Sequence, residues 1–160
     1  MKQNYTSAET SINAQKLPAV YRKIPFGDGK RALDYGCGRY INHLRNFANE
    51  RGSGWKGYDP FNYPTELSDW ERFDIVICSN VLNVIDSDEA MESVVRELSR
   101  RVFPTGECFI SIYEGNGSGE GRPTKRDCYQ RNQKTREYVE VVSRHFKHVR
   151  ISGNVLICSK

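Results

Sequence analysis

The sequence predicts an α/β fold in which helices cover both faces of a mostly parallel sheet. Three observations support this class. Short apolar runs alternate along the chain with segments of helical periodicity. The run Phe73–Cys78 is largely apolar and rich in β-branched residues, which is typical of a strand buried on both faces. Two strand-like runs, 148–151 and 154–159, flank Ser152 and Gly153, and this arrangement predicts a closing antiparallel hairpin.

Apolar periodicity and turn residues give the order of the remaining elements. Expected strands are 30–35, 54–59 and 107–113, and expected helices are 39–51, 86–101 and 134–146. The residues before Lys23 carry a weak helical pattern that Pro18 interrupts. Residues 60–72 include two prolines and are too few to hold a helix, a third strand and their connections. We therefore expect an abbreviated sheet edge after the second strand.

A chain of 160 residues fits a single domain. Within it we expect residues 1–25 to form an N-terminal helix or tail. We expect residues 114–132 to form a mobile loop, because glycine recurs at every second position from 115 to 121. The chain has no run of eighteen apolar residues and no apolar signal-peptide core, which favours a cytoplasmic protein without a membrane partner. The five cysteines form no C-x-x-C pair and match no histidine spacing, so we expect reduced thiols and no metal site.

Positive charge is concentrated in the C-terminal third. Residues 121–150 contain nine Lys and Arg against three acids, whereas the whole chain has a net charge of only +4. This uneven distribution favours an anionic partner. Solvated charges on a helix face and in loops would give the same pattern, and the sequence leaves both interpretations open.

A glycine turn and two acids form the strongest local pattern. Asp34 ends the first expected strand, and Gly36 and Gly38 follow before a helix. Such a turn tolerates positive φ and lets a ligand approach the backbone. Asp59 ends the second strand twenty-one residues beyond Gly38, where an acid in a nucleotide-binding βαβ unit binds ribose hydroxyls. We expect Asp59 to be exposed and to contribute mainly to a nucleoside-containing ligand. Ile41 stands where a dinucleotide fingerprint has its third glycine, which disfavours NAD.

The run Asp34-Tyr-Gly-Cys-Gly38 resembles the first motif of the class I, Rossmann-like S-adenosylmethionine-dependent methyltransferases, in which an acid precedes Gly-x-Gly. Tyr40 stands where many members carry a further glycine. The resemblance covers residues 30–160 and includes the closing hairpin. Residues 58–62, 79–85 and 119–132 are also similar to small methyltransferase-domain proteins found in bacteriophage genomes, which would place the protein in the host cytoplasm.

The resemblance implies methyl transfer from S-adenosylmethionine. Asp34 would receive the cofactor ammonium, and Asp59 would bind the ribose. The implied cofactor-binding residues are Asp34, Tyr35, Gly36, Cys37, Gly38, Asp59, Pro60, Ser79, Asn80 and Val81. Loops after the strands that resemble the family's fourth and fifth would supply the acceptor side, with Asn83, Tyr113, Lys125 and Gln130 as the catalytic candidates. Asp69 is the nearest candidate for an acid that contacts adenine.

Several alternatives stay open. Ser79-Asn-Val-Leu82 replaces the Pro-Pro-aromatic motif of amino-methylating DNA enzymes, and the chain has no Pro-Cys pair for cytosine C5 chemistry. Protein, RNA and small-molecule acceptors remain, and the basic third favours an anionic one, either RNA or a small molecule. The oligomeric state is open. The alternative function is a catalytically silent S-adenosylmethionine-binding module that acts through a partner. A nicotinamide-dependent oxidoreductase is a weaker one.

Overall fold

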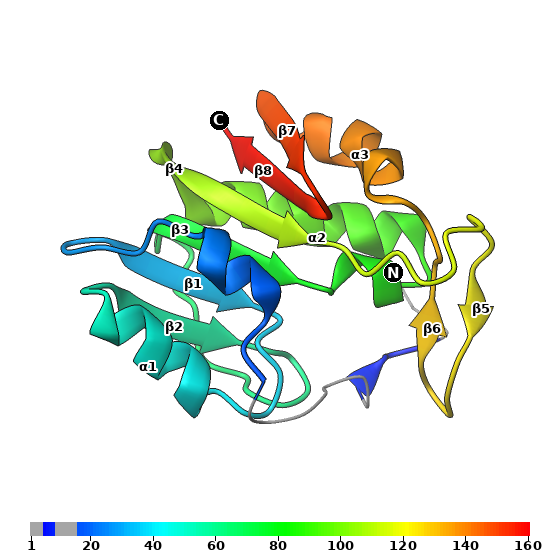
Figure 1. Ribbon diagram of the computed structural model, residues 1–160, viewed down its shortest axis with the longest axis horizontal. Coiled ribbons are helices and arrows are strands. Elements are labelled where there is room, and N and C mark those ends of the chain that lie inside the picture. The colour runs from blue at the N-terminus through cyan, green and yellow to red at the C-terminus, as the bar shows by residue number, and fades with distance from the viewer. Residues whose placement is uncertain (1–4, 9–15) are drawn as a thin grey trace.

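The computed structural model describes residues 5–8 and 16–160 of the chain. Its main sheet has six strands in the order β2-β1-β3-β4-β8-β7 (Figure 1). Four strands are parallel: β1 (Arg31–Tyr35), β2 (Gly54–Tyr58), β3 (Phe73–Ser79) and β4 (Val102–Ser111). β8 (Val155–Ser159) is antiparallel to β4, and β7 (His148–Ser152) is antiparallel to β8. The mostly parallel sheet and the closing hairpin are therefore confirmed.

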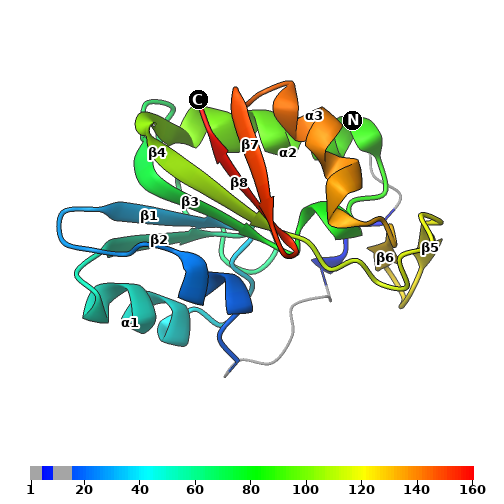
Figure 2. The ribbon, with the colours of Figure 1, turned by 45° about the horizontal axis from the view of Figure 1, so that its top comes forward.

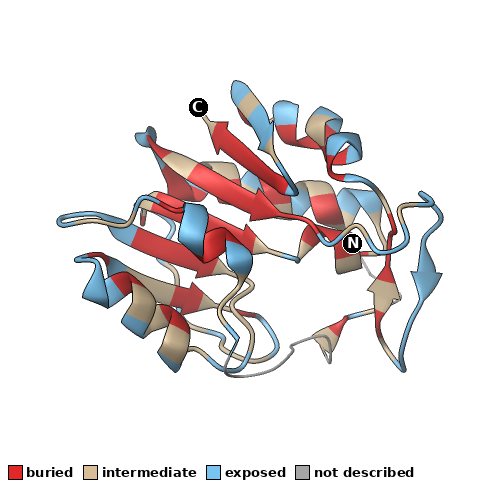
Figure 3. Ribbon diagram, in the orientation of Figure 1, coloured by how far each residue is buried: buried red, intermediate tan, exposed pale blue. Residues whose placement is uncertain are grey.

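Helices cover both faces of the sheet, as the sequence predicts (Figure 2). α2 (Asp88–Arg101) and α3 (Val139–Ser143) pack on one face, while α1 (Asn42–Glu50) and the short 3-10 helix η2 (Ala19–Lys23) pack on the other. Side chains of β3 alternate between the two layers: Val76 belongs to the α2 layer and Ile77 to the α1 layer. The central strands are buried, and the outer faces of the helices are exposed (Figure 3).

Some element boundaries differ from the prediction. α2 begins where expected, because the Ser87 hydroxyl accepts a hydrogen bond from Ala90 N at 3.2 Å. α1 begins at Asn42, because the residues before it complete the turn that leaves β1. The helix predicted over 134–146 divides into η4 (Thr135–Tyr138) and α3. β4 begins earlier than predicted, and the residues expected as a turn before it form an irregularity in its pairing with β3.

The abbreviated edge is present. Within the described chain, β2 pairs with β1 on one side and with no strand on the other. Residues 60–72 contain no named strand, and at their start an isolated bridge joins Asp59 to Tyr63. Leu67 packs against the core of the α2 layer. A single connecting segment therefore replaces the helix, the third strand and the connections of a longer fold.

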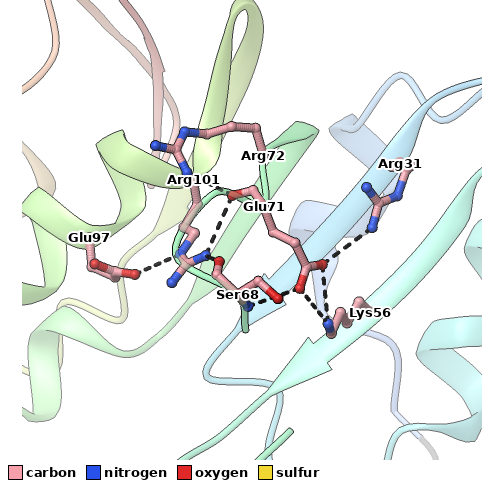
Figure 4. A network of polar contacts seen from close by, with 7 residues as sticks. All are labelled: Arg31, Lys56, Ser68, Glu71, Arg72, Glu97 and Arg101. Carbon is pink, nitrogen blue, oxygen red and sulfur yellow. Dashed lines mark hydrogen bonds and ion pairs between the residues drawn. The ribbon is translucent and has the colours of Figure 1, made fainter. Parts of the chain in front are cut away.

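A network of polar contacts, here named the edge clasp, holds this segment (Figure 4). The buried Glu71 carboxylate accepts hydrogen bonds from Lys56 Nζ and from Ser68 N, both at 3.0 Å, and from Arg31 Nη2 at 3.4 Å. The buried guanidinium of Arg101 donates to Ser68 O at 2.5 Å, and it pairs with Glu97. The edge clasp therefore ties the segment to β1, β2 and α2.

Residues 114–132 have more regular structure than the sequence suggests. β5 (Arg122–Pro123) and β6 (Tyr129–Gln130) form a two-stranded antiparallel ribbon that stands beyond the carboxyl ends of the main strands (Figure 1). The adjoining Cys128, Arg131 and Asn132 are buried. The mobility of this segment stays a prediction.

The described part of the N-terminal segment contacts two regions. The ring of Tyr5 stacks on Tyr129 with 5.7 Å between ring centroids, and Ser7 Oγ donates to Val84 O at 2.8 Å. η2 begins directly after Pro18, in agreement with the interruption predicted there. The rest of the predicted N-terminal helix or tail, residues 1–4 and 9–15, lies outside the described residues. None of the helices that the structure describes is long and apolar enough to cross a membrane.

Candidate functional site

The candidate site lies at the carboxyl ends of the parallel strands, where ligands bind in open α/β sheets. Strand register brings the ends together: Asp34 on β1 lies between Gly57 on β2 and Ile77 on β3. Ser79 ends β3 opposite Ser111 on β4. The glycine turn, Asp59 and the loop after β3 all follow from these ends.

The glycine turn is fixed by backbone geometry. Gly36 and Gly38 have φ angles of 96° and 78°, in the left-handed region that favours glycine. The amides of Gly36 and Cys37 both donate to Tyr58 O, at 2.6 and 3.1 Å, so the turn is tied to the end of β2. A Cβ atom on Gly36 would overlap Val81 Cγ2. The turn therefore fits against the loop after β3 only because Gly36 has no side chain.

Asp59 is buried, which corrects the expectation that it is exposed. Its side chain and backbone together are only 9% exposed. Oδ2 accepts a hydrogen bond from Gly38 N at 3.0 Å, and Oδ1 accepts from the amides of Phe61 and Asn62, each at 2.9 Å. A carboxylate at the end of a strand can accept hydrogen bonds from the free backbone amides of the adjoining turns, and these bonds replace the ones that it would make to water. Asp59 therefore holds the glycine turn in place. Its role as a ribose ligand stays a prediction.

Asp34 is the most deeply buried acid of the site, with 2% of its surface exposed. Its Oδ2 accepts a hydrogen bond from the hydroxyl of Tyr21, and Trp55 Nε1 donates to that hydroxyl at 3.0 Å. Oδ1 is buried and has no hydrogen-bond partner among the described residues. Burial raises the pKa of Asp34 to about 7. The Tyr21 hydrogen bond opposes this rise, and the charge of Asp59 adds to it.

The other residues of the predicted cofactor set divide between site and core. Cys37 packs in the α1 layer near Asp34, and burial raises the pKa of its thiol. Pro60 is exposed directly after Asp59. The ring of Tyr35 packs against Tyr58 in the α2 layer, with 4.9 Å between centroids. Only the backbone of Tyr35 therefore reaches the turn. Burial also raises the pKa of its hydroxyl.

The loop after β3 lies over the turn. Asn80 has a φ of 56°, a left-handed conformation that asparagine tolerates better than most residues, and its N–H donates to Ser111 O at 3.0 Å. Its side chain is exposed. The hydroxyls of Ser79 and Ser111 are 3.1 Å apart and hydrogen bonded. Ser79, Asn80 and Val81 therefore lie at the carboxyl end of β3, beside the glycine turn, and their role as cofactor ligands stays a prediction.

Three of the four catalytic candidates meet. Asn83, in η3 (Leu82–Val84), donates from Nδ2 to Gln130 Oε1 at 3.1 Å and accepts from Tyr113 N at 3.3 Å. Gln130 Nε2 donates to Tyr113 O at 2.9 Å. Both side-chain amides are buried, and their hydrogen bonds join the ribbon to the segments that follow β3 and β4. The ring of Tyr113 is the reachable group, because that residue is 60% exposed.

Lys125 is not brought to these three residues. It lies in the turn between β5 and β6 and is exposed. The basic residues of the C-terminal third also divide. Arg131 pairs with Asp88 at 2.7 Å, and Arg144 pairs with Glu92 at 3.2 Å. Part of the predicted basic excess therefore belongs to internal ion pairs. The exposed Arg122, Lys125 and Arg126 on the ribbon are at the end of the sheet that carries the site.

Tyr21 contacts Asp34 and Trp55 contacts Tyr21, but neither residue was predicted from the sequence. Tyr21 lies on η2, thirteen residues before Asp34, and it looked like one apolar position of a weak helical pattern. Asp69 lies next to the edge clasp, near the start of β1, and so away from the carboxyl ends. Among the described residues, no group of three or more His, Cys, Asp and Glu side chains is arranged to hold a metal ion.

A separate open pocket of about 400 Å³ is lined by residues of β4, β7 and β8. Glu107, Lys147, His148 and Arg150 contribute to its lining, and none of the predicted site residues does. Glu107 pairs with Ile75 near the start of β3, and His148 pairs with Ser159 at the same end of the hairpin, so the pocket is away from the carboxyl ends. The glycine turn and its acids therefore remain the candidate site.

The sequence and the structure were both compared with those of known proteins. No protein-family model and no curated protein sequence matches the chain. Solved structures do match it. One is the 1,6-didemethyltoxoflavin-N1-methyltransferase of Burkholderia thailandensis with S-adenosylhomocysteine bound, with a TM-score of 0.65 and 19% identity over 82% of this chain and 70% of that one. Another is a 16S rRNA N2 methyltransferase of T. thermophilus in complex with AdoMet and guanosine, with a TM-score of 0.57 and 15% identity.

That second match covers 93% of this chain but only 45% of the rRNA enzyme, so the chain spans less than half of that protein. A Listeria monocytogenes protein described as an S-adenosylmethionine-dependent methyltransferase matches with a TM-score of 0.58 and 12% identity, over 87% of this chain and 94% of that one. At these identities the likeness concerns the fold. The chain therefore has the fold of the class I S-adenosylmethionine-dependent methyltransferases.

Proposed function

We propose that this protein binds S-adenosylmethionine and transfers its methyl group to an acceptor. The observation that carries the proposal is Asp34 Oδ1, which is buried beside a glycine turn and has no hydrogen-bond partner among the described residues. A buried carboxylate oxygen without a partner is costly unless a ligand satisfies it. An ammonium group offers the charge and the N–H donors that this oxygen lacks. The likeness of the fold to methyltransferases supports the same ligand.

The residues of the site can be given roles in this proposal. Asp34 would accept the ammonium of the methionine moiety, and the backbone from Gly36 to Gly38 would lie against the same moiety. Asp59 would hold the turn and face the ribose. Ser79 and its neighbours Asn80 and Val81 would form the wall on the adenine side.

The chemistry needs little more from the protein than placement. When bound, S-adenosylmethionine supplies a methyl group that its sulfonium already makes reactive towards a nucleophile. The chain must then hold the acceptor atom in line with that group and exclude water. Tyr113 is exposed at the end of β4, and its backbone is fixed by Asn83 and Gln130. These three residues are the proposed acceptor side of the site.

We propose an anionic acceptor, either RNA or a small molecule. The supporting observation is the exposed positive charge of Arg122, Lys125 and Arg126 on the ribbon, beyond the carboxyl ends of the strands. The two ligand-bound neighbours act on different acceptors, one on a small molecule and one on rRNA. Both types of acceptor therefore suit this fold.

Calorimetry and a transfer assay test the proposal together. Wild-type protein should bind S-adenosylmethionine and S-adenosylhomocysteine but not NAD, and Asp34→Ala should lose this binding. Labelled methyl groups should then pass from the cofactor to an RNA or a small-molecule fraction of a cell lysate, separated before counting. Binding without any transfer would favour the silent binding module. Selective binding of NAD would overturn the proposal.

A further inference from the structure

We propose that Tyr21 is a positioning residue for the cofactor: its hydroxyl, aligned by Trp55, occupies one carboxylate oxygen of Asp34 and leaves the other for the cofactor ammonium. The inference rests on the proposed function. It adds a residue that lies outside the glycine motif, and it gives the short helix η2 a part in ligand binding.

The direction of the hydrogen bonds follows from the donors available. The indole of Trp55 can only donate, so the oxygen of Tyr21 accepts that hydrogen bond, at 3.0 Å. The single hydroxyl proton of Tyr21 is then directed to Asp34 Oδ2. Burial and the charge of Asp34 raise the pKa of Tyr21 well above its ordinary value, so this proton stays in place at any ordinary pH. The two hydrogen bonds therefore run in one direction, from Trp55 to Tyr21 and from Tyr21 to Asp34.

This direction makes the two oxygens of Asp34 unequal. Oδ2 is satisfied by Tyr21, whereas Oδ1 is buried without a partner among the described residues. The packing of Tyr21 against Phe26 and Phe47, with ring centroids 5.6 and 6.0 Å away, fixes the ring that carries the hydroxyl. A carboxylate held at one oxygen presents the other in a fixed direction, which is the requirement for binding one ammonium group.

The groups around Asp34 make its ionisation depend on Tyr21. From β2 comes Trp55, which does not titrate, and from the turn after β2 comes the acid Asp59. The thiols of Cys37, after β1, and Cys78, on β3, also lie near. None of these groups is a cation, so the hydrogen bond from Tyr21 is the interaction that favours the charged form. Loss of this bond moves the ionisation of Asp34 to higher pH.

The consequence is a pH profile that depends on both ligand and residue. An ammonium-bearing ligand needs the ionised form of Asp34, so its affinity should rise with pH and level off above about 7. A ligand without the ammonium should show no such profile. Tyr21→Phe removes the hydroxyl but keeps the ring, so it should move the midpoint upward by about one pH unit and weaken binding about fivefold at pH 7 and about tenfold at pH 6. Affinity should recover above pH 8.

The test uses the full chain and two probes. Calorimetry from pH 6 to pH 8.5 with S-adenosylhomocysteine, which carries the ammonium, is compared with 5′-methylthioadenosine, which lacks the amino-acid part. NMR titration of the Asp34 carboxyl carbon in the ligand-free protein, assigned with Asp34→Asn, gives a second readout. Tyr138→Phe is the matched control, because Tyr138 is buried like Tyr21, with 1% of its surface exposed, and its hydroxyl has no partner among the described residues. It should leave both midpoints unchanged.

The outcomes separate this inference from the proposed function. If wild-type protein binds S-adenosylhomocysteine and Tyr21→Phe keeps the same midpoint, the role of Tyr21 is refuted while the function stands. An equal loss of both probes at every pH would make Tyr21 a packing residue only. If wild-type protein binds neither probe, both proposals fall, and the NMR midpoint still decides whether Tyr21 controls Asp34. Should Tyr21→Phe not fold, Trp55→Phe should give a smaller shift in the same direction, and no shift would refute the alignment.

Discussion

Asp59→Ala should destabilise the protein as well as weaken the cofactor site. The substitution removes three hydrogen bonds between a carboxylate and backbone amides, from Gly38, Phe61 and Asn62. Each such bond contributes about 1.5–3 kcal/mol. Phe61 is exposed, so water can replace part of what is lost, and removal of a negative charge near Asp34 offsets some of the rest. We therefore expect a net cost of about 3 kcal/mol, or a fall in Tm of about 6–12 °C.

Scanning calorimetry at pH 7 measures the stability, and titration with S-adenosylhomocysteine measures the site. Affinity should fall at least about tenfold, equivalent to 1.4 kcal/mol. Asp59→Asn is the matched variant, because it keeps one oxygen for Phe61 and Asn62 but turns an N–H group towards Gly38 N. It should lose less stability than Asp59→Ala. A Tm of Asp59→Ala within 2 °C of wild type would show that Asp59 does not hold the turn, and an unchanged affinity would remove it from the site.

Three further perturbations test other parts of the structure. Gly36→Ala should cost at least about 2 kcal/mol in urea unfolding, because φ is 96° and the new methyl group would overlap Val81; adding Val81→Ala should recover the steric part but not the backbone strain. Replacing Lys125 and Arg126 together with alanine should leave cofactor affinity within about threefold, since neither residue lies near the turn, while methyl transfer to an anionic acceptor falls, most at low salt; equal transfer rates in both proteins would contradict this. The free energy of unfolding should also depend on the ionisation of Asp34. Because folding raises its pKa, the stability that Asp34 contributes is fully present below the ordinary pKa of 3.8 and is lost as pH rises to about 7, roughly 4 kcal/mol in all. Urea titrations at several pH values should show this slope in wild-type protein and a flatter one in Asp34→Asn.

The fold was predictable where burial leaves a regular pattern in the sequence. Phe73–Cys78 is apolar because β3 has helices on both faces, and the two final runs pair around Ser152 and Gly153. The helix expected over 134–146 is only partly correct. Its first turn is the 3-10 helix η4, and α3 ends at Ser143, because the apolar positions suit either helix geometry. The start of β4 was missed because a strand irregularity and a turn use the same residues, Pro104 to Gly106.

The site was predictable in its backbone and not in its side-chain partners. Spacing placed Asp34, Gly36 and Asp59 at adjoining strand ends, since parallel register is set by the elements themselves. The hydrogen bond from Tyr21 depends on how η2 packs across β1, which no local pattern encodes. The ribbon was missed for a similar reason: Asn132 and its neighbours anchor it through polar contacts, and apolar periodicity does not detect such an anchor.

We expect the edge clasp also to limit self-association of the protein. In the described part of the chain, β2 presents one row of backbone groups with no strand beside it, and such an edge is a template for pairing with another chain. Burial raises the pKa of Glu71, but hydrogen bonds from Lys56 and Ser68 outweigh it, and the pKa lies below its ordinary value. The clasp is therefore complete above the ordinary pKa of a glutamate and weakens as pH falls through that of Glu71. Acid should release the segment beside β2 before the sheet unfolds, so that light scattering rises in acid while the far-UV spectrum is still native. Storage near neutral pH would keep the edge clasp intact.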